Sequence, residues 1–458
     1  MINPSTVALA TDLYQLTMGA GYHAMGKNDR AVFSLFVRVL PPTRSFLVAA
    51  GLDDALDRVR ALQFDRESID YLRSTGHIHE EFLDALTRLR FTGDIWAMPE
   101  GRAFFANEPI LEVEANILEA QLVETAIINA LHYPTLVATK ATRCLAAAPE
   151  ATMIEFGLRR TPSIDAGLAA ARAAYLVGFA STSNVLAGQR YGIPIAGTMA
   201  HSFIEAFPSE LEAFRAFAAV YPGPPTLLID TYDTIAGAQH AVQVARELAA
   251  EGRRLFAVRI DSGDLDRLSR AVREILDKAG LRDVRIVASG GLDETQIAEL
   301  TRSGAPIDAY GIGTRLVTSS DAPSADMAYK LVQYAGAPRL KLSDGKETLV
   351  GPKQAWRSRD TNGRFAGDVI TARTEPAPGP DWEPLLVPVM QNGEILTRAT
   401  LAEGRTRHRA EMASLPPALL DPLGQASYPV ALSTRLEEQQ QNAVAAARQL
   451  EGLIAGGS

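Results

Sequence analysis

The middle of the chain repeats one pattern: a short apolar run rich in β-branched residues, then a segment with helical periodicity. The apolar runs are TMIEFGL, YLVGFAS, PIAGTMA, TLLIDTY, LFAVRIDS, VRIVASGG and AYGIGTRL. Strands that alternate with helices imply parallel strands joined by crossover helices. Seven such units favour a closed or incomplete (β/α) barrel over a short open sheet, and a doubly wound sheet is the alternative.

The flanking regions follow other patterns. Residues 1–135 mix strand-like and amphipathic segments with a turn-rich stretch, which predicts a separate α+β N-terminal domain. The barrel-like catalytic domain is expected over 136–350, after a long helical stretch in which Pro134 predicts a kink or break. Residues 351–458 lose the alternation and are interpreted as an appendage that packs on the N-terminal domain. The predicted fold class is therefore α/β, an irregular (β/α) barrel with an N-terminal domain and a C-terminal extension.

Composition excludes several classes of protein. The net charge of −9 argues against a broad nucleic-acid surface, which needs clustered Lys and Arg. The single cysteine, Cys144, rules out an intrachain disulfide and a metal cage built from cysteines. The first residues lack the basic flank and apolar block of a signal peptide, and no apolar run is long enough to span a membrane. We therefore expect a cytosolic protein with no membrane partner.

Polar residues and glycines follow every apolar run. In a parallel barrel these positions share one face, at the carboxyl ends of the strands, where active sites lie. They are Glu155, Gly157, Arg159, Arg160, Ser181, Thr182, Ser183, Thr198, His201, Ser202, Asp230, Thr231, Asp233, Arg259, Asp261, Ser262, Gly263, Asp264, Ser289, Gly290, Gly291, Gly311, Gly313 and Thr314.

Two glycine segments follow the last two strands. Gly290 and Gly291 stand in ASGG, and Gly311 and Gly313 stand in YGIGT. Glycine lets backbone N–H groups approach an anion, and barrels often bind phosphate with their last two loops. The pair favours a phosphate site over simple tight turns. It is no dinucleotide fingerprint, because the third glycine is missing.

The segment RIDSGDL offers a cation and two carboxylates. Arg259 has a planar fork suited to a carboxylate or phosphate. Asp261 and Asp264 carry oxygen ligands suited to Mg²⁺ or to ribose hydroxyls, although the alternative is that Ser262 or Asp261 caps the following helix. Asp230 in IDTYDT repeats the theme at a strand end.

His201 stands in GTMAHS, at the end of a predicted strand. An isolated histidine is usually an ordinary polar residue, but the expected neighbours of His201 are carboxylates and phosphate-type loops. A neutral imidazole held by an acidic partner is a good nucleophile or general base. No second His or Cys lies at zinc-ligand spacing.

These segments together resemble one family. ALATDLYQLTMGAGY, EFGLRR, GFASTSNVLAG, GTMAHSFI, IDTYDT, RIDSGDL, SGGL, GIGT and KLSDGKETLVGPKQ resemble nicotinate phosphoribosyltransferase, in the family's order, over about residues 8–355. The resemblance implies a type II phosphoribosyltransferase-like fold and the conversion of nicotinate and phosphoribosyl pyrophosphate to nicotinate mononucleotide and pyrophosphate. It also implies coupling to ATP hydrolysis, a need for Mg²⁺, and a homodimer with the active site at its interface.

The resemblance also implies roles for single residues. His201 corresponds to a transiently phosphorylated histidine, and Asp230 and Asp261 to catalytic carboxylates, with Asp261 and Asp264 as metal ligands. The substrate-binding residues so implied are Tyr14 (from the neighbouring subunit), Phe156, Arg159, Ser183, Thr198, Arg259, Ser289, Gly290, Gly291, Gly311, Gly313 and Thr314.

Ser183 bears on the choice of base. The related nicotinamide enzyme carries an aspartate at this position of STSNVLAG, which would repel a carboxylate, whereas serine does not. With Arg159 nearby in the sequence motifs, nicotinate is the expected base. Two rival interpretations are a quinolinate phosphoribosyltransferase, which lacks the histidine segment, and a catalytically silent barrel, which predicts lost motif residues.

Overall fold

The structure is a computed structural model that describes residues 7–343, 347–424, 426–450 and 452. The chain divides into two compact units. The first unit comprises Met1–Leu136, Ser324–Leu419 and Gln425–Ser458; the second comprises Val137–Pro323 and Leu420–Gly424. The boundary at Leu136 falls inside one continuous helix, α7 (Glu124–Ala147), which passes through Pro134 without ending.

A seven-stranded antiparallel sheet organises the first unit. Its strands, in spatial order, are β13 (Ala337–Pro338), β12 (Met327–Tyr334), β1 (Arg30–Val37), β5 (Leu111–Asn116), β3 (Asp94–Ala97), β17 (Val387–Gln391) and β18 (Glu394–Ile395). Asn392 and Gly393 both have positive φ and form the two-residue turn of the hairpin that joins β17 to β18, as an Asn-Gly pair favours.

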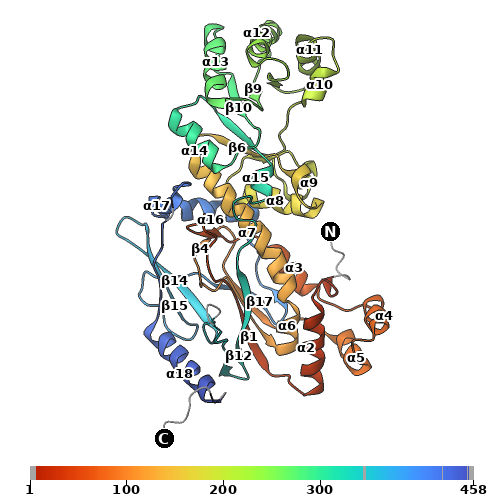
Figure 1. Cartoon of the computed structure of the whole chain (residues 1–458), viewed down its shortest axis with the longest axis vertical. Helices are drawn as coiled ribbons and strands as arrows, with labels where there is room; N and C mark the ends of the chain where they lie inside the picture. Colours follow the sequence, from red (N-terminus) through yellow and green to blue (C-terminus); the bar gives the residue numbers. More distant parts are fainter. Residues whose placement is uncertain (1–6, 344–346, 425, 451, 453–458) are drawn as a thin grey trace. The chain divides into compact units, whose positions relative to one another are not determined.

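Helices and two smaller sheets complete the first unit (Figure 1). The helices are α2 (Leu13–Ala24), α3 (Leu52–Arg60), α4 (Arg66–Thr75), α5 (Glu80–Arg88), α6 (Ile117–Leu122), α16 (Leu401–Ser414), α17 (Pro417–Leu420) and α18 (Thr434–Leu450). The smaller sheets pair β2 (Leu47–Val48) with β4 (Ala103–Phe104), and β16 (Glu383–Pro384), β14 (Lys353–Arg359), β15 (Phe365–Ala372) and β19 (Val430–Leu432) in that order. Apolar side chains of α3, α5 and the seven-stranded sheet share one buried core.

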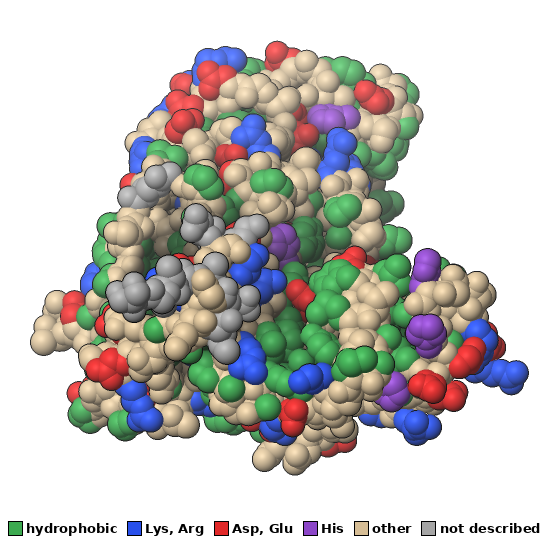
Figure 2. Space-filling model, turned by 60° about the horizontal axis from the view of Figure 1, so that its bottom comes forward, with side chains coloured by type: hydrophobic (Ala, Val, Ile, Leu, Met, Phe, Trp, Pro, Cys, Tyr) green, Lys and Arg blue, Asp and Glu red, His purple; other side chains and the backbone are tan. Residues whose placement is uncertain are grey.

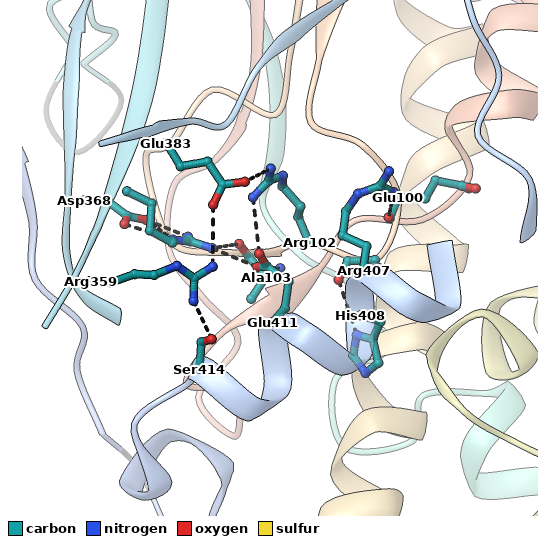
Figure 3. A network of polar contacts seen from close by, with 12 residues as sticks. Glu100, Arg102, Ala103, Arg359, Asp368, Glu383, Arg407, His408, Glu411 and Ser414 are labelled. Atoms are coloured by element: carbon teal, nitrogen blue, oxygen red, sulfur yellow. Dashed lines mark hydrogen bonds and ion pairs between the residues drawn. The ribbon is translucent and has the colours of Figure 1, made fainter. Parts of the chain in front are cut away.

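A buried ionic network joins distant segments of the first unit (Figure 3). Arg357 of β14 is fully buried and donates to Asp368 of β15 at 2.6 Å and to Glu411 of α16 at 2.9 Å. Glu411 also accepts from Arg102, which precedes β4. The guanidinium of Arg357 lies 4.4 Å from the ring centroid of Phe365. The network therefore ties residues near 100 to the two segments 353–372 and 401–414.

A six-stranded parallel sheet organises the second unit. Its order is β7 (Ser181–Thr182), β6 (Thr152–Glu155), β11 (Ala309–Ile312), β10 (Arg285–Ala288), β9 (Ala257–Ile260) and β8 (Thr226–Leu228). The helices are α8 (Ile164–Val177), α9 (Val185–Tyr191), α10 (His201–Glu205), α11 (Glu210–Val220), α12 (Thr234–Ala250), α13 (Leu265–Lys278), α14 (Glu294–Ser303) and α15 (Thr314–Val317), with a 3₁₀ turn η1 (Leu158–Arg160). Figure 1 shows α12 and α13 beside β9 and β10, with which they share a core. The predicted α/β class with an incomplete barrel is confirmed.

The PIAGTMA segment is not the seventh strand that its pattern predicts. It forms one isolated bridge, Thr182 to Ile195, flanked by hydrogen bonds between Thr182 and residues 194 and 196. Pro194 has no N–H to donate, and Gly192 and Gly197 lower the strand propensity on either side. β7 is therefore an edge strand, and the barrel stays open between β7 and β8.

The main segment of the second unit ends at Pro323, earlier than the boundary expected at residue 350. The reason is β12, which pairs along its whole length with β1 in the sheet of the first unit. Residues 351–419 and 426–450 group with the N-terminal segment in that same unit. Residues 344–346 of the KLSDGKETLVGPKQ motif lie outside the described residues.

The surface carries both signs of charge. On the face drawn in Figure 2, Lys and Arg side chains alternate with Asp and Glu side chains instead of forming a field of one sign. Within the described residues, no helix combines the length and the apolar character needed to cross a membrane.

Candidate active site

The second unit assembles most of the sequence-predicted residues at one edge of its sheet. Because all six strands are parallel, their carboxyl ends lie at the same edge, and the loops that follow them meet there. Hydrogen bonds, an ion pair, a cation–π contact and close backbone approaches join the following residues: Phe156, Thr198, His201, Asp230, Arg259, Asp261, Ser289, Gly290, Gly311 and Gly313.

Arg259, near the end of β9, is the centre of this cluster. Its Nε donates to Ser289 Oγ at 2.8 Å and its Nη2 to Asp261 Oδ1 at 2.6 Å. Its Nη1 donates to Thr198 Oγ1 at 3.3 Å and to the Met199 carbonyl at 3.4 Å. The side chain is 14% exposed, so the guanidinium is held by partners from three loops while one face stays accessible.

Asp261 is kept ionised by its neighbours. Burial opposes the charged form, but hydrogen bonds from Ser289 and Arg259 outweigh it, so the pKa of Asp261 is lowered. Its Oδ1 receives both of these hydrogen bonds. The second oxygen, Oδ2, faces His201. A fixed negative charge therefore stands beside the imidazole.

His201 is the first residue of α10 and is half-exposed. Its Nδ1 lies 3.1 Å from Thr231 Oγ1, and its Nε2 lies 4.0 Å from Asp261 Oδ2. The ring is thus oriented by a hydroxyl on one side and a carboxylate on the other. This arrangement suits a nucleophile or general base, since an acidic partner stabilises the cation that forms.

Asp230 follows β8 and holds the loop after β9. Its Oδ2 accepts from the Asp261 N–H at 2.9 Å and from Ser262 Oγ at 2.6 Å. Its other oxygen, Oδ1, is buried and has no hydrogen-bond partner among the described residues. A buried carboxylate oxygen is costly to leave unpaired, so it fits a ligand hydroxyl or a cation.

Phe156 and two glycines define the shape of the site. The Phe156 ring lies 5.7 Å from the Arg259 guanidinium. A Cβ at Gly311 would lie 2.5 Å from the nearest atoms of that ring, so any residue larger than glycine at this position would clash with the Phe156 ring. Gly290 has φ +98°, and a Cβ there would lie 1.9 Å from the Asp261 carbonyl oxygen, which requires glycine on both counts.

The helix after the first glycine loop is already capped. Asp293 accepts from the N–H groups of Thr295 and Gln296 at the start of α14, and its second oxygen pairs with Arg315 at 2.7 Å. A helix N-terminus can supply backbone N–H donors to an anion at such a position. Since Asp293 takes those donors, the glycine loops Ser289–Gly291 and 311–314 are left as the candidate phosphate cradle.

Other predicted residues make no side-chain contact with this cluster in the described structure. Arg159 is exposed on η1, and Ser183 is exposed after β7. Asp264 is exposed and caps α13 by accepting from the Arg267 N–H, whereas the alternative interpretation expected Ser262 or Asp261 as the cap. Thr314 and Gly291 are exposed in the last two loops. Tyr14 belongs to the first unit, where its hydroxyl donates to Glu124 at 3.1 Å and burial raises its pKa to about 12.

The structure adds partners that the sequence prediction left without a role. Thr231 orients His201, Ser262 binds Asp230, and the Met199 carbonyl accepts from Arg259. Thr231 and Ser262 stand next to predicted site residues in the strand-end segments, and this position in the sequence was the only indication that they belong to the site. The Met199 contact is made by the backbone and leaves no side-chain signal.

Comparisons with known proteins give consistent matches. Residues 9–132 match the model of the nicotinate phosphoribosyltransferase N-terminal domain, and residues 151–346 match that of the nicotinate phosphoribosyltransferase family. Nicotinate phosphoribosyltransferase pncB2 of Mycobacterium tuberculosis is 48% identical over 435 residues, which cover 94% of this chain and 92% of that protein. Nicotinate phosphoribosyltransferase of Bacillus subtilis is 39% identical over 81% of this chain and 77% of its own length. The crystal structure of human nicotinic acid phosphoribosyltransferase matches with a TM-score of 0.85 and 32% identity, over 94% of this chain and 99% of that one.

Proposed function

Since this chain belongs to the nicotinate phosphoribosyltransferase family, enzymes of NAD salvage, we propose that it couples its reaction to ATP through transient phosphorylation of His201. The reaction joins nicotinate to the ribose of phosphoribosyl pyrophosphate and releases pyrophosphate. The single observation that carries the proposal is the placement of His201 between Thr231 and Asp261, beside the Arg259 fork.

The base subsite is assigned to the loops after β6 and β7. Phe156 stacks on the pyridine ring, next to the cation of Arg259. Arg159 is exposed and available to the nicotinate carboxylate, for which a guanidinium is the matching donor. Ser183, exposed after β7, is a neutral side chain that would not repel the carboxylate.

The displacement at ribose C1 has oxocarbenium character, so it needs positioning and stabilisation of the leaving anion. Arg259 supplies a fixed cation, and the loops with Gly290, Gly291, Gly311, Gly313 and Thr314 supply backbone N–H groups for phosphate. Thr198 and Ser289 hold Arg259 in place. The ionised carboxylate of Asp261 and the unpaired Oδ1 of Asp230 are suited to the ribose hydroxyls.

The carboxylates also fit Mg²⁺. No group of three or more His, Cys, Asp or Glu side chains in the described part of the chain is placed to hold a metal ion. Mg²⁺ usually binds through one or two carboxylates plus substrate phosphates, and the buried, unpaired Oδ1 of Asp230 fits such a use. Asp261 and Asp264 are the further carboxylates proposed to hold it, and the ion would neutralise charge on the pyrophosphate.

Phosphorylation would change the charge next to Asp261. Transfer of the γ-phosphoryl group of ATP to the His201 imidazole, with ADP as the leaving group, would add negative charge and strong acceptor oxygens at the sheet edge. Those oxygens can bind the Arg259 guanidinium or Mg²⁺ and so organise the site for pyrophosphate. Attack of water on the phosphohistidine then releases phosphate, returns the imidazole to its resting state and makes the cycle depend on ATP.

Replacing His201 by alanine is expected to abolish the stimulation by ATP while the fold is kept, because the phosphate acceptor is lost from a half-exposed position. The measurement is the rate of mononucleotide formation with and without ATP, together with thermal unfolding. Thr231→Val is the matched control: it removes the hydrogen bond to Nδ1 but keeps the imidazole, so ATP stimulation weakens without vanishing. Undiminished ATP stimulation in His201→Ala would refute the phosphohistidine role.

Replacing Ser183 by aspartate is expected to lower kcat/KM for nicotinate by about tenfold or more, since a like charge facing a carboxylate is costly. Ser183→Asn has nearly the same size as the aspartate variant without its charge, and it should keep the preference for nicotinate over nicotinamide. The two bases are compared in parallel assays. An unchanged preference in Ser183→Asp would remove Ser183 from the carboxylate subsite.

We also propose that the enzyme is a homodimer in the cytosol, where ATP is supplied, with Tyr14 of one subunit completing the site of the other. Helix α2 supports an interface, since it exposes Leu13, Tyr14 and Met18 to solvent and the residue after it, Met25, is exposed as well. Tyr14 is 48% exposed while its hydroxyl is anchored on Glu124, which leaves the ring face available for stacking.

A further inference from the structure

Glu155 is a buried carboxylate that no step of the proposed reaction uses. It is the last residue of β6 and is 1% exposed. One carboxylate oxygen, Oε1, accepts from the Gly157 N–H, and the other, Oε2, accepts from the Thr182 hydroxyl at 2.5 Å. Both oxygens are therefore committed to loops at the carboxyl edge of the sheet, where the candidate active site lies.

The main chain of Glu155 reinforces these contacts. Its carbonyl accepts from the Ser183 N–H at 2.9 Å. The Thr182 hydroxyl, besides donating to Glu155, accepts from the Asn184 N–H at 3.0 Å. Asn184 in turn caps α9 through the Ala187 N–H. One residue thus fixes the loop after β6 to the loop after β7 and to the start of α9.

The two joined loops carry the residues assigned to the base. Phe156 follows Glu155 directly, and Arg159 lies in the same loop. Ser183 lies between Thr182 and Asn184, and the Asn184 N–H donates to the Thr182 hydroxyl, which itself donates to Glu155. The residues assigned to phosphate stand elsewhere: Arg259 near the end of β9, Gly290 and Gly291 after β10, and Gly311, Gly313 and Thr314 at or after the end of β11. A change at Glu155 is therefore expected to act on one half of the site.

The cost of burying this acid supports a specific role. Burial raises the pKa of Glu155, and the hydrogen bonds from Thr182 and Gly157 work against that shift. An apolar residue would fill the same volume without this cost, but it would leave the Gly157 N–H and the Thr182 hydroxyl without their acceptor.

We propose that Glu155 is a positioning residue of the nicotinate subsite, which clamps loop 156–160 to loop 182–184 and so sets the separation of Phe156 and Ser183. The assignment of these residues to nicotinate rests on the proposed function. The clamp itself rests on the hydrogen bonds of Glu155 alone.

The test compares Glu155→Ala and Glu155→Gln with the wild type. Glu155→Ala is expected to raise the KM for nicotinate about tenfold, a typical effect of removing a buried hydrogen-bond partner, with the KM for phosphoribosyl pyrophosphate unchanged. Glu155→Gln keeps an acceptor for the Gly157 N–H and should rescue most of the loss. Thr182→Val should raise the same KM, and Thr182→Ser should restore it.

Hydrogen exchange provides a readout that needs no substrate. In Glu155→Ala, amides of 156–160 and 182–184 should exchange faster than in the wild type. Asp308→Asn is the matched control, since Asp308 also holds a backbone N–H, that of Ile286 at 2.7 Å, but precedes β11 at the opposite edge of the sheet. It should leave exchange in both loops and the KM for nicotinate as in the wild type.

The outcomes separate the two claims. Unchanged exchange in both loops, or equal rises in both KM values in Glu155→Ala and Thr182→Val, would overturn the clamp. Faster exchange in a protein whose wild type makes no nicotinate mononucleotide would uphold the clamp and overturn the proposed function. If Glu155→Ala does not fold, Glu155→Gln and the two Thr182 variants carry the same comparison.

Discussion

Replacing Arg259 with lysine is expected to lower kcat/KM for mononucleotide formation by about 10²- to 10³-fold, the usual cost of removing a preorganised donor from an active site. The planar fork of Arg259 binds Ser289, Asp261 and Thr198 at once. A lysine has one ammonium group on a flexible stem and cannot keep all three partners. The cation would remain, but its place beside Phe156 and the glycine loops would not be fixed.

The control for this prediction is Arg285→Lys. Arg285 is the first residue of the neighbouring strand β10, at the opposite edge of the same sheet, where its guanidinium lies 5.4 Å from the Phe256 ring. This variant should keep kcat/KM close to the wild-type value. If Arg259→Lys also stayed within about threefold of the wild type, Arg259 would not be the centre of an active site.

Replacing Arg357 with methionine is expected to lower the free energy of unfolding by about 3–5 kcal/mol, because removing one partner leaves buried charges uncompensated. Arg357 and Asp368 are both fully buried, and Glu411 is 3% exposed. Methionine fills part of the volume but satisfies neither carboxylate nor the Ala103 carbonyl, which accepts from Arg357 at 3.0 Å. Urea-induced unfolding measures the change.

Arg359→Met is the matched control, since Arg359 stands two residues further along β14. Its side chain is 36% exposed, and its ion pair with Glu383 spans 3.5 Å. An exposed ion pair of this kind contributes about 1 kcal/mol or less. Equal losses in the two variants would mean that burial of the network in Figure 3 does not determine its contribution to stability.

The parallel sheet was predictable because its signal is local. Apart from the two-residue β7, each strand of the second unit lies in a mostly apolar run, is three or four residues long and is followed by a helix. Handedness and adjacency rules then bring the carboxyl ends together. That is why Arg259, Asp261, Asp230 and His201, which lie up to 60 residues apart, were expected at one edge. The prediction of a strand at PIAGTMA was wrong, because the apolar residues of this run do not indicate which backbone N–H groups are free to pair with a neighbouring strand.

The architecture of the first unit was less predictable because its contacts are non-local. β12 pairs with β1, which lies almost 300 residues earlier in the chain, and the sequence of β12 does not indicate that β1 is its partner. The same holds for the network that links Arg102, Arg357 and Glu411. Isolated strands and charged residues were visible in the sequence, but their pairing depends on the complete fold.

In the site, residue types were predictable and exact partners were not. Glycine is required at positions 290 and 311 because the Asp261 carbonyl oxygen and the Phe156 ring come close to their backbones. The sequence showed the glycines but not these contacts. A cap of α13 was expected from Ser262 or Asp261 as the alternative to ligand binding, and the structure shows that an oxygen of Asp264 caps the helix instead. The roles of Thr231 and Glu155 depend on distances between loops, which no sequence motif specifies.

The most direct test is mononucleotide formation by the wild-type protein from nicotinate, nicotinamide and quinolinate in separate reactions. Each reaction contains phosphoribosyl pyrophosphate and Mg²⁺, with and without ATP. The account predicts product from nicotinate, a rate that rises with ATP, and little or no product from the other two bases. Product from quinolinate alone, or from none of the three, would contradict it.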